Sequence, residues 1–234
     1  MPRSIRRPAL AAAVLALAAP LAAGSAPALA AKVELTGTLG ISPGRPASKA
    51  IIKKTRAKYT GSYFRMILPG GTDRFFLNSD SRAKDKSYTL FRTGNDGGLK
   101  LGAFQAPPTP AFTANGFARS RRIVLPEKFA GIAFSISTAP TDAQTGLADT
   151  PPRLFVTGRR ITGDLRAWTA AWNRIYFNQG APKPNGTLPG KTKPVNGTYD
   201  PKTKAYEISW YSLIVGGPFN GFTGYWHLQG TVRP

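Results

Sequence analysis

TYDPKTKAYEISWYSLIVGGPFNGFTGYWHLQGTV (198–232) is the stretch that decides the fold. Apolar and polar residues alternate on both sides of its glycine-rich centre, as expected for an antiparallel hairpin with one buried face. The Asp200-Pro201 pair is typical of a type I turn, and it connects VNGTY (195–199) to the strand that begins near Ala205. These features predict a three-stranded antiparallel meander at the end of the chain.

The alternation also predicts which residues share a face of the meander. We expect a hairpin centred on Asn220, so that Trp210 lies opposite Gly230 and covers the bare backbone of that glycine. The same register places Trp226 and Leu228 on the buried face. The opposite face then carries four polar or amphipathic side chains, which are Tyr211, Tyr225, His227 and Gln229.

These four side chains are the candidate ligand-binding residues. His227 is the only histidine of the chain, and nothing in the hairpin gives it a packing role. The alternative is a surface histidine that is hydrogen-bonded to a neighbour. In the connection GGPFNGFTG (216–224), Phe219 and Phe222 are either tips that stack on sugar rings or a lid on the end of the sheet.

The rest of the chain also has the alternation of β-strands. Windows with helical spacing of apolar residues are interrupted by Gly or Pro. We expect an all-β fold, an antiparallel β-sandwich or barrel-like sheet, with long Pro/Gly-rich loops at 106–116 and 178–194. The clearest strands are VELTGTLGI (33–41), GIAFSIS (131–137), two strands around Gly158-Arg159, and a hairpin in which TGNDGG joins SYTLFR (87–92) to LKLGAFQ (99–105).

The first 30 residues have the pattern of a secretory signal peptide. Arg3, Arg6 and Arg7 precede a stretch rich in Ala, Leu and Val, and Ala28-x-Ala30 is typical of a cleavage site. The apolar run is shorter than the about 20 residues that a membrane-spanning helix needs. We therefore expect an exported protein, extracellular, cell-wall-associated or periplasmic, with no transmembrane segment in the mature chain.

Residues 31–234 are expected to form a single β domain. A five-residue pattern with a central glycine recurs along it and indicates a weak internal duplication with a boundary near 140–150. Chance is the alternative, because glycines mark bulges and bends in many β-proteins. The four copies are LTGTL (35–39), ITGDL (161–165), VNGTY (195–199) and LQGTV (228–232).

The composition indicates an anionic partner. The predicted signal peptide holds three of the 32 basic residues and none of the 11 acidic ones, so residues 31–234 carry a net charge of +18. Such an excess attracts anionic envelope polymers or glycans, and export makes nucleic acid a less expected partner. Solvation of strand faces by basic side chains is the alternative.

The basic residues are concentrated in GRPASKAIIKKTRAKYTGSYFRMIL (44–68), which has no acidic residue. Tyrosine and phenylalanine are interleaved with the cations, as in grooves that hold anionic polymers. An exposed edge strand that lysines protect from aggregation would look the same. The candidate basic surface consists of Arg45, Lys49, Lys53, Lys54, Arg56 and Lys58.

Catalytic and metal-binding motifs fail on inspection. GISPG (40–44) has the spacing of a nucleophile elbow, but the oxyanion hole needs the backbone N–H that Pro43 lacks. SRAK (81–84) has the spacing of the catalytic motif S-x-x-K, but neither the S-D-N nor the K-T-G motif that accompanies it follows. Asp142 and Asp149 could share a calcium ion, yet the pattern of an EF-hand loop is missing. With one histidine and no cysteine, we predict no catalytic, metal or cofactor site.

The segment GGPFNGFTGYWHLQGT, with YDPKTKAYEISWYSLIV before it, resembles the closing segment of uncharacterised exported bacterial β-proteins. The resemblance covers residues 199–231. It implies an all-β exported protein and carries no activity.

Together these observations favour an exported, non-catalytic β-protein. It would associate with the cell envelope, or with an extracellular anionic or glycan ligand, through a basic and aromatic surface. Two alternatives stay open, a glycan-acting hydrolase whose carboxylate pair the sequence does not identify, and a purely structural surface protein.

Overall fold

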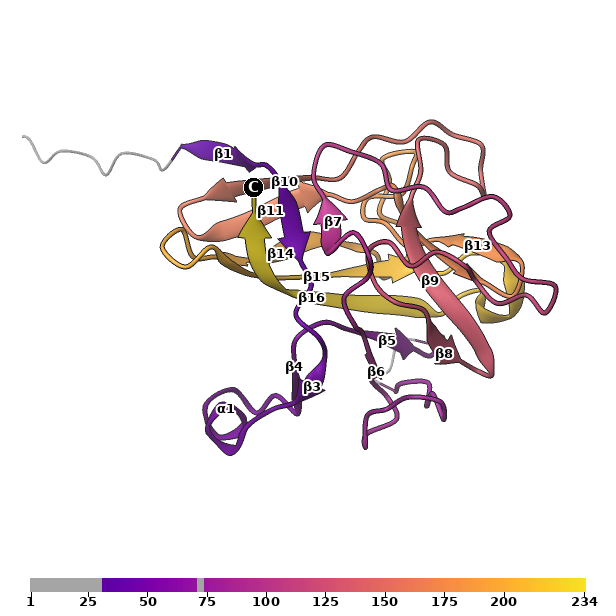
Figure 1. Ribbon diagram of the computed structural model, residues 1–234, viewed down its shortest axis with the longest axis horizontal. Helices are drawn as coiled ribbons and strands as arrows, with labels where there is room; N and C mark the ends of the chain where they lie inside the picture. The colour runs from indigo at the N-terminus through magenta and orange to yellow at the C-terminus, as the bar shows by residue number, and fades with distance from the viewer. Residues whose placement is uncertain (1–30, 71–73) are drawn as a thin grey trace, which may run out of the picture.

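The computed structural model describes residues 31–70 and 74–234, and the predicted signal peptide lies outside them. Nearly all of the regular structure is antiparallel β-sheet (Figure 1), which confirms the predicted fold class. No helix in the described part of the chain is both long and apolar enough to cross a bilayer.

One large curled sheet carries most of the strands. β16 (Thr223–Arg233) pairs with β15 along one edge, and its other edge is divided between β5 at Thr223–His227 and β2 at Val232 and Arg233. The strand order is β1 (Lys32–Leu35), β10 (Arg153–Thr157), β11 (Arg160–Asp164), β14 (Lys193–Tyr199), β15 (Ala205–Leu213), β16, β2 (Thr38–Gly40) and β7 (Gly98–Lys100), with β5 (Tyr63–Ile67) and β6 (Thr89–Leu90) on the branch.

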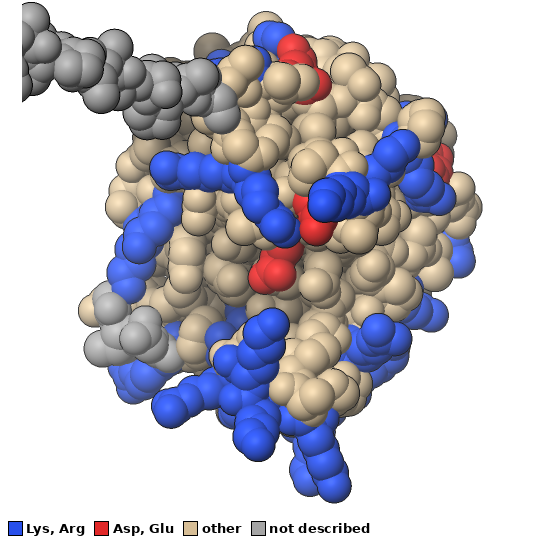
Figure 2. Space-filling model, turned by 90° about the vertical axis from the view of Figure 1, so that its left-hand side faces the viewer, with Lys and Arg blue, Asp and Glu red and all other residues tan. Residues whose placement is uncertain are grey.

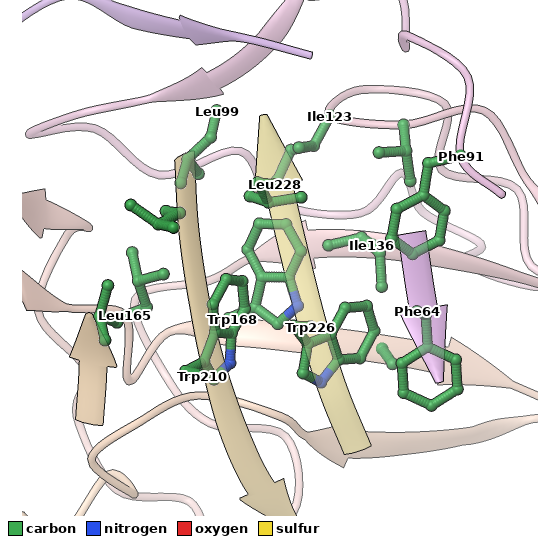
Figure 3. Packing of buried hydrophobic residues seen from close by; sticks show 14 of the residues in the cluster. Phe64, Phe91, Leu99, Ile123, Ile136, Leu165, Trp168, Trp210, Trp226 and Leu228 are labelled. Carbon is green, nitrogen blue, oxygen red and sulfur yellow. The ribbon is translucent and has the colours of Figure 1, made fainter. Parts of the chain in front are cut away.

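A second sheet packs on the inner face of the first. Trp168 of this sheet lies edge-on to Trp210 and Trp226 of the large sheet, with ring centroids 5.2 and 5.6 Å apart, and all three side chains are fully buried (Figure 3). Burial of such large rings is the main stabilising contribution to the core. The strand order is β13 (Ile175–Asn178), β12 (Trp168–Trp172), β9 (Ile132–Thr138) and β8 (Glu127–Phe129).

Strands from before and after residues 140–150 pair with each other in the large sheet. β1, from the start of the chain, pairs with β10, and β2 pairs with β16 at the end of the chain. The main hydrophobic cluster accordingly extends from Leu35 to Val232. The internal duplication remains a prediction.

The C-terminal meander forms, but the predicted register of its hairpin is wrong by four residues. Trp210 lies opposite Trp226, and Tyr206 lies opposite Gly230. The centre of the hairpin is Pro218 instead of Asn220, and Gly217–Phe219 forms a 3-10 turn there. An even shift keeps every side chain on its predicted face, so Trp210, Trp226 and Leu228 are buried.

The predicted hairpin between 87–92 and 99–105 does not form. β6 pairs with β5 and β7 pairs with β2, so the TGNDGG segment crosses between two parts of the sheet. Its backbone N–H groups bond to the carbonyls of residues 121–123 instead. Gly98 has φ of 146°, and a Cβ there would lie 2.0 Å from the Leu39 carbonyl oxygen, so the glycine serves a close crossing and not a hairpin turn.

The remaining strand predictions have mixed outcomes. Two strands do flank Gly158-Arg159, and residues 131–137 correspond to β9. VELTGTLGI is divided into β1 and β2, because Gly37 adopts φ of 90° between them. Phe219 is buried and Phe222 packs against the core, as expected if the two rings form a lid on the end of the sheet.

The basic stretch contains a helix where the sequence suggested only strands. α1 (Lys49–Thr55) lies between β3 (Arg45–Pro46) and β4 (Tyr59–Thr60) and projects away from the sheets (Figure 1). Ser48 caps it by accepting a hydrogen bond from the Ile51 N–H, and Arg56 ends it in a left-handed conformation. None of the residues of α1 is buried. The edge-strand alternative is therefore wrong for residues 49–55.

Candidate ligand-binding face

The outer face of the large sheet, opposite the tryptophan core, carries a set of aromatic and cationic side chains. Successive residues of a strand point to opposite faces, so the strands that bury Trp210, Trp226 and Phe64 turn their neighbours outward. We call this outer surface the tyrosine face. Its residues are Tyr63 and Arg65 from β5, Lys193 from β14, Tyr211 from β15 and Tyr225 from β16.

Four of these residues form one straight row across four strands. Lys193 pairs with Tyr211, Tyr211 with Tyr225, and Tyr225 with Arg65. The rings of Tyr211 and Tyr225 have centroids 4.9 Å apart, and the Lys193 ammonium lies 5.3 Å from the Tyr211 centroid. Neighbouring strands are about 4.8 Å apart, so the row is about 15 Å long. A cation stands at each end and two half-buried rings lie between them.

The rings continue beyond this row. Tyr63 lies next to Tyr225, with centroids 6.2 Å apart, and Tyr88 and Tyr59 follow at 5.0 and 4.6 Å. Burial raises the pKa of Tyr63 and of Tyr225, so both hydroxyls stay neutral at physiological pH. The series of rings therefore continues from Tyr211 through Tyr225, Tyr63 and Tyr88, and it ends at the buried Tyr59.

Arg65 is held in place by its own aromatic contacts. Its guanidinium lies 3.3 Å from the centroid of Phe75 and 4.2 Å from that of Tyr88, and it donates a hydrogen bond to the Ser87 hydroxyl at 3.0 Å. A guanidinium fixed between two rings is an ordered cation.

His227 lies on this face but is covered. Its ring stacks on Tyr63, with centroids 4.5 Å apart and an interplanar angle of 12°, and the residue is only 7% exposed. Nδ1 lies 2.9 Å from the Gly61 carbonyl oxygen, and Nε2 lies 3.1 Å from the Glu207 carboxylate. This hydrogen bond is the main cause of the lowered pKa of Glu207. His227 therefore positions Tyr63 and does not itself face a ligand.

Gln229 borders a groove beside the face. Its side-chain oxygen accepts a hydrogen bond from the Gly61 N–H at 2.7 Å. The groove lies where β5 has ended and β2 has not yet begun to pair with β16, and it has a volume of about 430 Å³. Its lining includes Arg45, Ile51, Thr60, Gln229 and Thr231.

The predicted basic residues lie next to this groove on one projecting element. Lys58 differs from the other five because its charge is neutralised by an ion pair with Asp85 at 2.8 Å. Figure 2 shows Lys and Arg side chains gathered at the lower end of the molecule, where α1 projects in Figure 1. Within residues 31–70 and 74–234, no ion pair is formed by Arg45, Lys49, Lys53, Lys54 or Arg56.

The strand alternation predicted two of the five residues of the tyrosine face, Tyr211 and Tyr225, and missed the other three. Tyr211, Tyr225, His227 and Gln229 do share one side of the sheet. Tyr63, Arg65 and Lys193 come from strands whose pairing the hairpin pattern does not reveal. The sequence does contain a signal for β5. Buried and outward-facing residues alternate in YFRMI as they do in β16, and this alternation predicts a strand with one face toward the core.

The two aspartates of 142–149 do interact, but away from the tyrosine face. Burial and the charge of Asp142 raise the pKa of Asp149 to about 6. Asp142 accepts hydrogen bonds from Thr145 and Asn178. A neighbouring cavity of about 300 Å³ is lined by Gln144, Thr145 and Asn178, among others, and by neither aspartate. No group of three or more metal-ligating side chains occurs among the described residues.

No family model matches the sequence, and neither a curated protein nor a solved structure shows significant similarity to the chain. The resemblance of residues 199–231 to exported bacterial β-proteins stays a prediction.

Proposed function

We propose that this is an exported, non-catalytic protein that binds an extended acidic glycan on the tyrosine face. The observation that carries the proposal is the row formed by Lys193, Tyr211, Tyr225 and Arg65, with two rings between two cations. Binding at the cell envelope or outside the cell is consistent with the predicted signal peptide and with the excess of basic residues.

The chemistry of the row fits a charged sugar polymer. A sugar ring presents an apolar face of C–H groups that packs on an aromatic ring, and its hydroxyls remain available to polar neighbours. Carboxylates or phosphates along the polymer would meet Lys193 at one end and Arg65 at the other. A row of about 15 Å accommodates a few sugar units, because strand spacing and sugar length are both close to 5 Å.

The groove beside the row extends the same surface. Gln229 and Thr231 supply hydrogen-bonding side chains there, and Arg45 supplies a further cation. A polymer that crosses the row can continue into this groove. We therefore expect affinity to rise with chain length until the groove is filled.

The experiment compares one polymer with and without its charge. Polygalacturonate and its fully methyl-esterified form have the same sugar backbone, and only the first carries carboxylates. We expect residues 31–234 to bind polygalacturonate more tightly at low salt, and the difference to shrink as NaCl is raised. Residual binding of the ester would report the rings alone. Failure of both polymers to bind would contradict the proposal.

A further inference from the structure

The element formed by residues 44–58, which we call the basic arm, is exposed on every side of its helix. α1 has no buried residue, although it is folded and capped at both ends. A helix of seven residues gains little stability by itself, so an exposed one is not explained by its contribution to folding. It therefore needs another explanation.

The charge of the basic arm is largely unneutralised, because residues 44–58 contain six basic residues and no acidic one, and only Lys58 among them forms an ion pair within the described part of the chain. The arm's own exposed cations Lys49, Lys53 and Lys54 have no acidic partner among the described residues, as noted above for Arg45 and Arg56. Elsewhere in the described chain, six basic side chains form ion pairs with acidic ones: Arg153 with Glu34, Arg82 and Arg92 with Glu127, Arg122 with Asp96, Arg159 with Asp200, and Arg166 with Asp164.

Two isoleucines stand among these cations. Ile51 is 37% exposed and Ile52 is 45% exposed, and they precede Lys53 and Lys54 directly. Branched aliphatic side chains cannot form hydrogen bonds or ion pairs with a hydrated polysaccharide or a nucleic acid. They gain free energy when they enter hydrocarbon, while lysines beside them keep their ammonium groups at the level of lipid phosphates.

We infer that the basic arm docks this protein on an anionic phospholipid surface. Ile51 and Ile52 enter the boundary between headgroups and acyl chains, and the five unpaired cations contact the phosphates. The complementarity of charge excludes a second copy of the arm as the partner, because two arms repel each other. Arg45 and Ile51 of the arm also line the groove beside the tyrosine face, but no residue of the tyrosine face itself belongs to the arm, so the inference does not depend on the proposed glycan.

The experiment is co-sedimentation with lipid vesicles. Residues 31–234 contain the whole hydrophobic core, so the predicted signal peptide can be left out. Vesicles of phosphatidylglycerol and phosphatidylcholine in equal parts are compared with vesicles of phosphatidylcholine alone. We expect binding to the anionic vesicles only, weakened about fivefold for each lysine removed in Lys49→Gln, Lys53→Gln and Lys54→Gln.

Matched variants separate the basic arm from general charge and general apolarity. Lys84→Gln, Lys100→Gln and Lys202→Gln remove the same charge from exposed positions outside the arm. Leu77→Ser and Leu188→Ser remove exposed apolar side chains elsewhere. Both sets should bind nearly as well as the wild type, whereas Ile51→Ser with Ile52→Ser should lose most of the binding.

A spectroscopic reading tests insertion directly. The chain has no cysteine, so Ile52→Cys carries a single polarity-sensitive fluorophore. We expect its emission to shift to the blue on anionic vesicles, and the emission of the same fluorophore on Leu77→Cys to stay unchanged. The inference is overturned if binding is equal on neutral vesicles, if it survives loss of both isoleucines, or if neither fluorophore shifts.

Discussion

Two hydrogen-bond acceptors hold the ring of His227, the Gly61 carbonyl and the Glu207 carboxylate. The ring packs flat against Tyr63, which lies in the row of tyrosines. His227 is therefore a positioning residue that holds Tyr63 in place on the tyrosine face.

The strand alternation was enough to place His227 on the outer side of the sheet. It could not show that the side chain is covered, because Gly61 is 166 residues away in the sequence. The alternation did not identify Arg65 and Lys193 as residues of the tyrosine face for the same reason. A hairpin pattern predicts the pairing of its own two strands and does not predict which distant strand lies beside them.

Asp149 provides a residue-level prediction of pH dependence. Its pKa is raised to about 6, and neither carboxylate oxygen has a hydrogen-bond partner among the described residues. The neutral form is favoured in the folded state, so its stabilisation is present below about pH 4 and is lost as pH rises through 6. Asp149→Asn should therefore match the wild type at pH 4 and be more stable at pH 8, by about 1 to 2 kcal/mol after allowance for solvent screening.

Urea unfolding at both pH values measures this difference. Glu207→Gln is the matched control of opposite sign, because the pKa of Glu207 is lowered. The stabilisation from Glu207 is present at neutral pH and is lost as pH falls through the folded-state pKa. An Asp149→Asn variant that is less stable than the wild type at pH 8 would show that the carboxylate is needed there.

At the scale of elements, the divided edge of β16 builds the site. β5 brings Tyr63 and Arg65 to the tyrosine face, β2 completes the sheet, and the groove lies between them. The sequence predicted the existence of β15 and β16 because their alternation is long and regular. It missed their register and the helix α1, because a glycine-rich turn and a seven-residue helix depend on local capping that alternation does not report.

The close approach of β2 to β16 makes a prediction for Gly230. A Cβ at this position would lie 1.7 Å from the Gly40 carbonyl oxygen, so the two backbones can lie this close only if residue 230 is a glycine. Gly230→Ala should reduce the free energy of unfolding by about 3 kcal/mol or more. Gly158→Ala is the control, since it has φ of 61° and no atom within 4 Å of its Cβ, and should lose about 1 kcal/mol. Equal losses would contradict this close approach of the two strands.

The exposed helix α1 should be nearly irrelevant to stability. Ile51→Ser with Ile52→Ser removes no buried contact, so the free energy of unfolding should change by less than about 0.5 kcal/mol. Leu228→Ala, in the core, should cost about 3 kcal/mol in the same urea titration. A large loss in the double isoleucine variant would mean that α1 serves the fold.

At the scale of the whole molecule, aromatic residues take the place of disulfides. The chain has 25 aromatic residues and no cysteine, and three of its four tryptophans meet in the middle of the core. Composition and alternation were therefore sufficient for the fold class. The face that we propose for binding depends on which distant strands become neighbours, and that is a property of the assembled sheet.

The most direct test of the central claim removes one ring from the middle of the row. We predict that Tyr225→Ala binds polygalacturonate about tenfold more weakly than the wild type in isothermal titration at low salt, because a ring at the centre of a binding surface carries much of the affinity. Tyr176→Ala, a half-buried tyrosine on the second sheet, should bind as the wild type does. Equal affinity of Tyr225→Ala and the wild type would contradict the assignment of the tyrosine face as the binding surface.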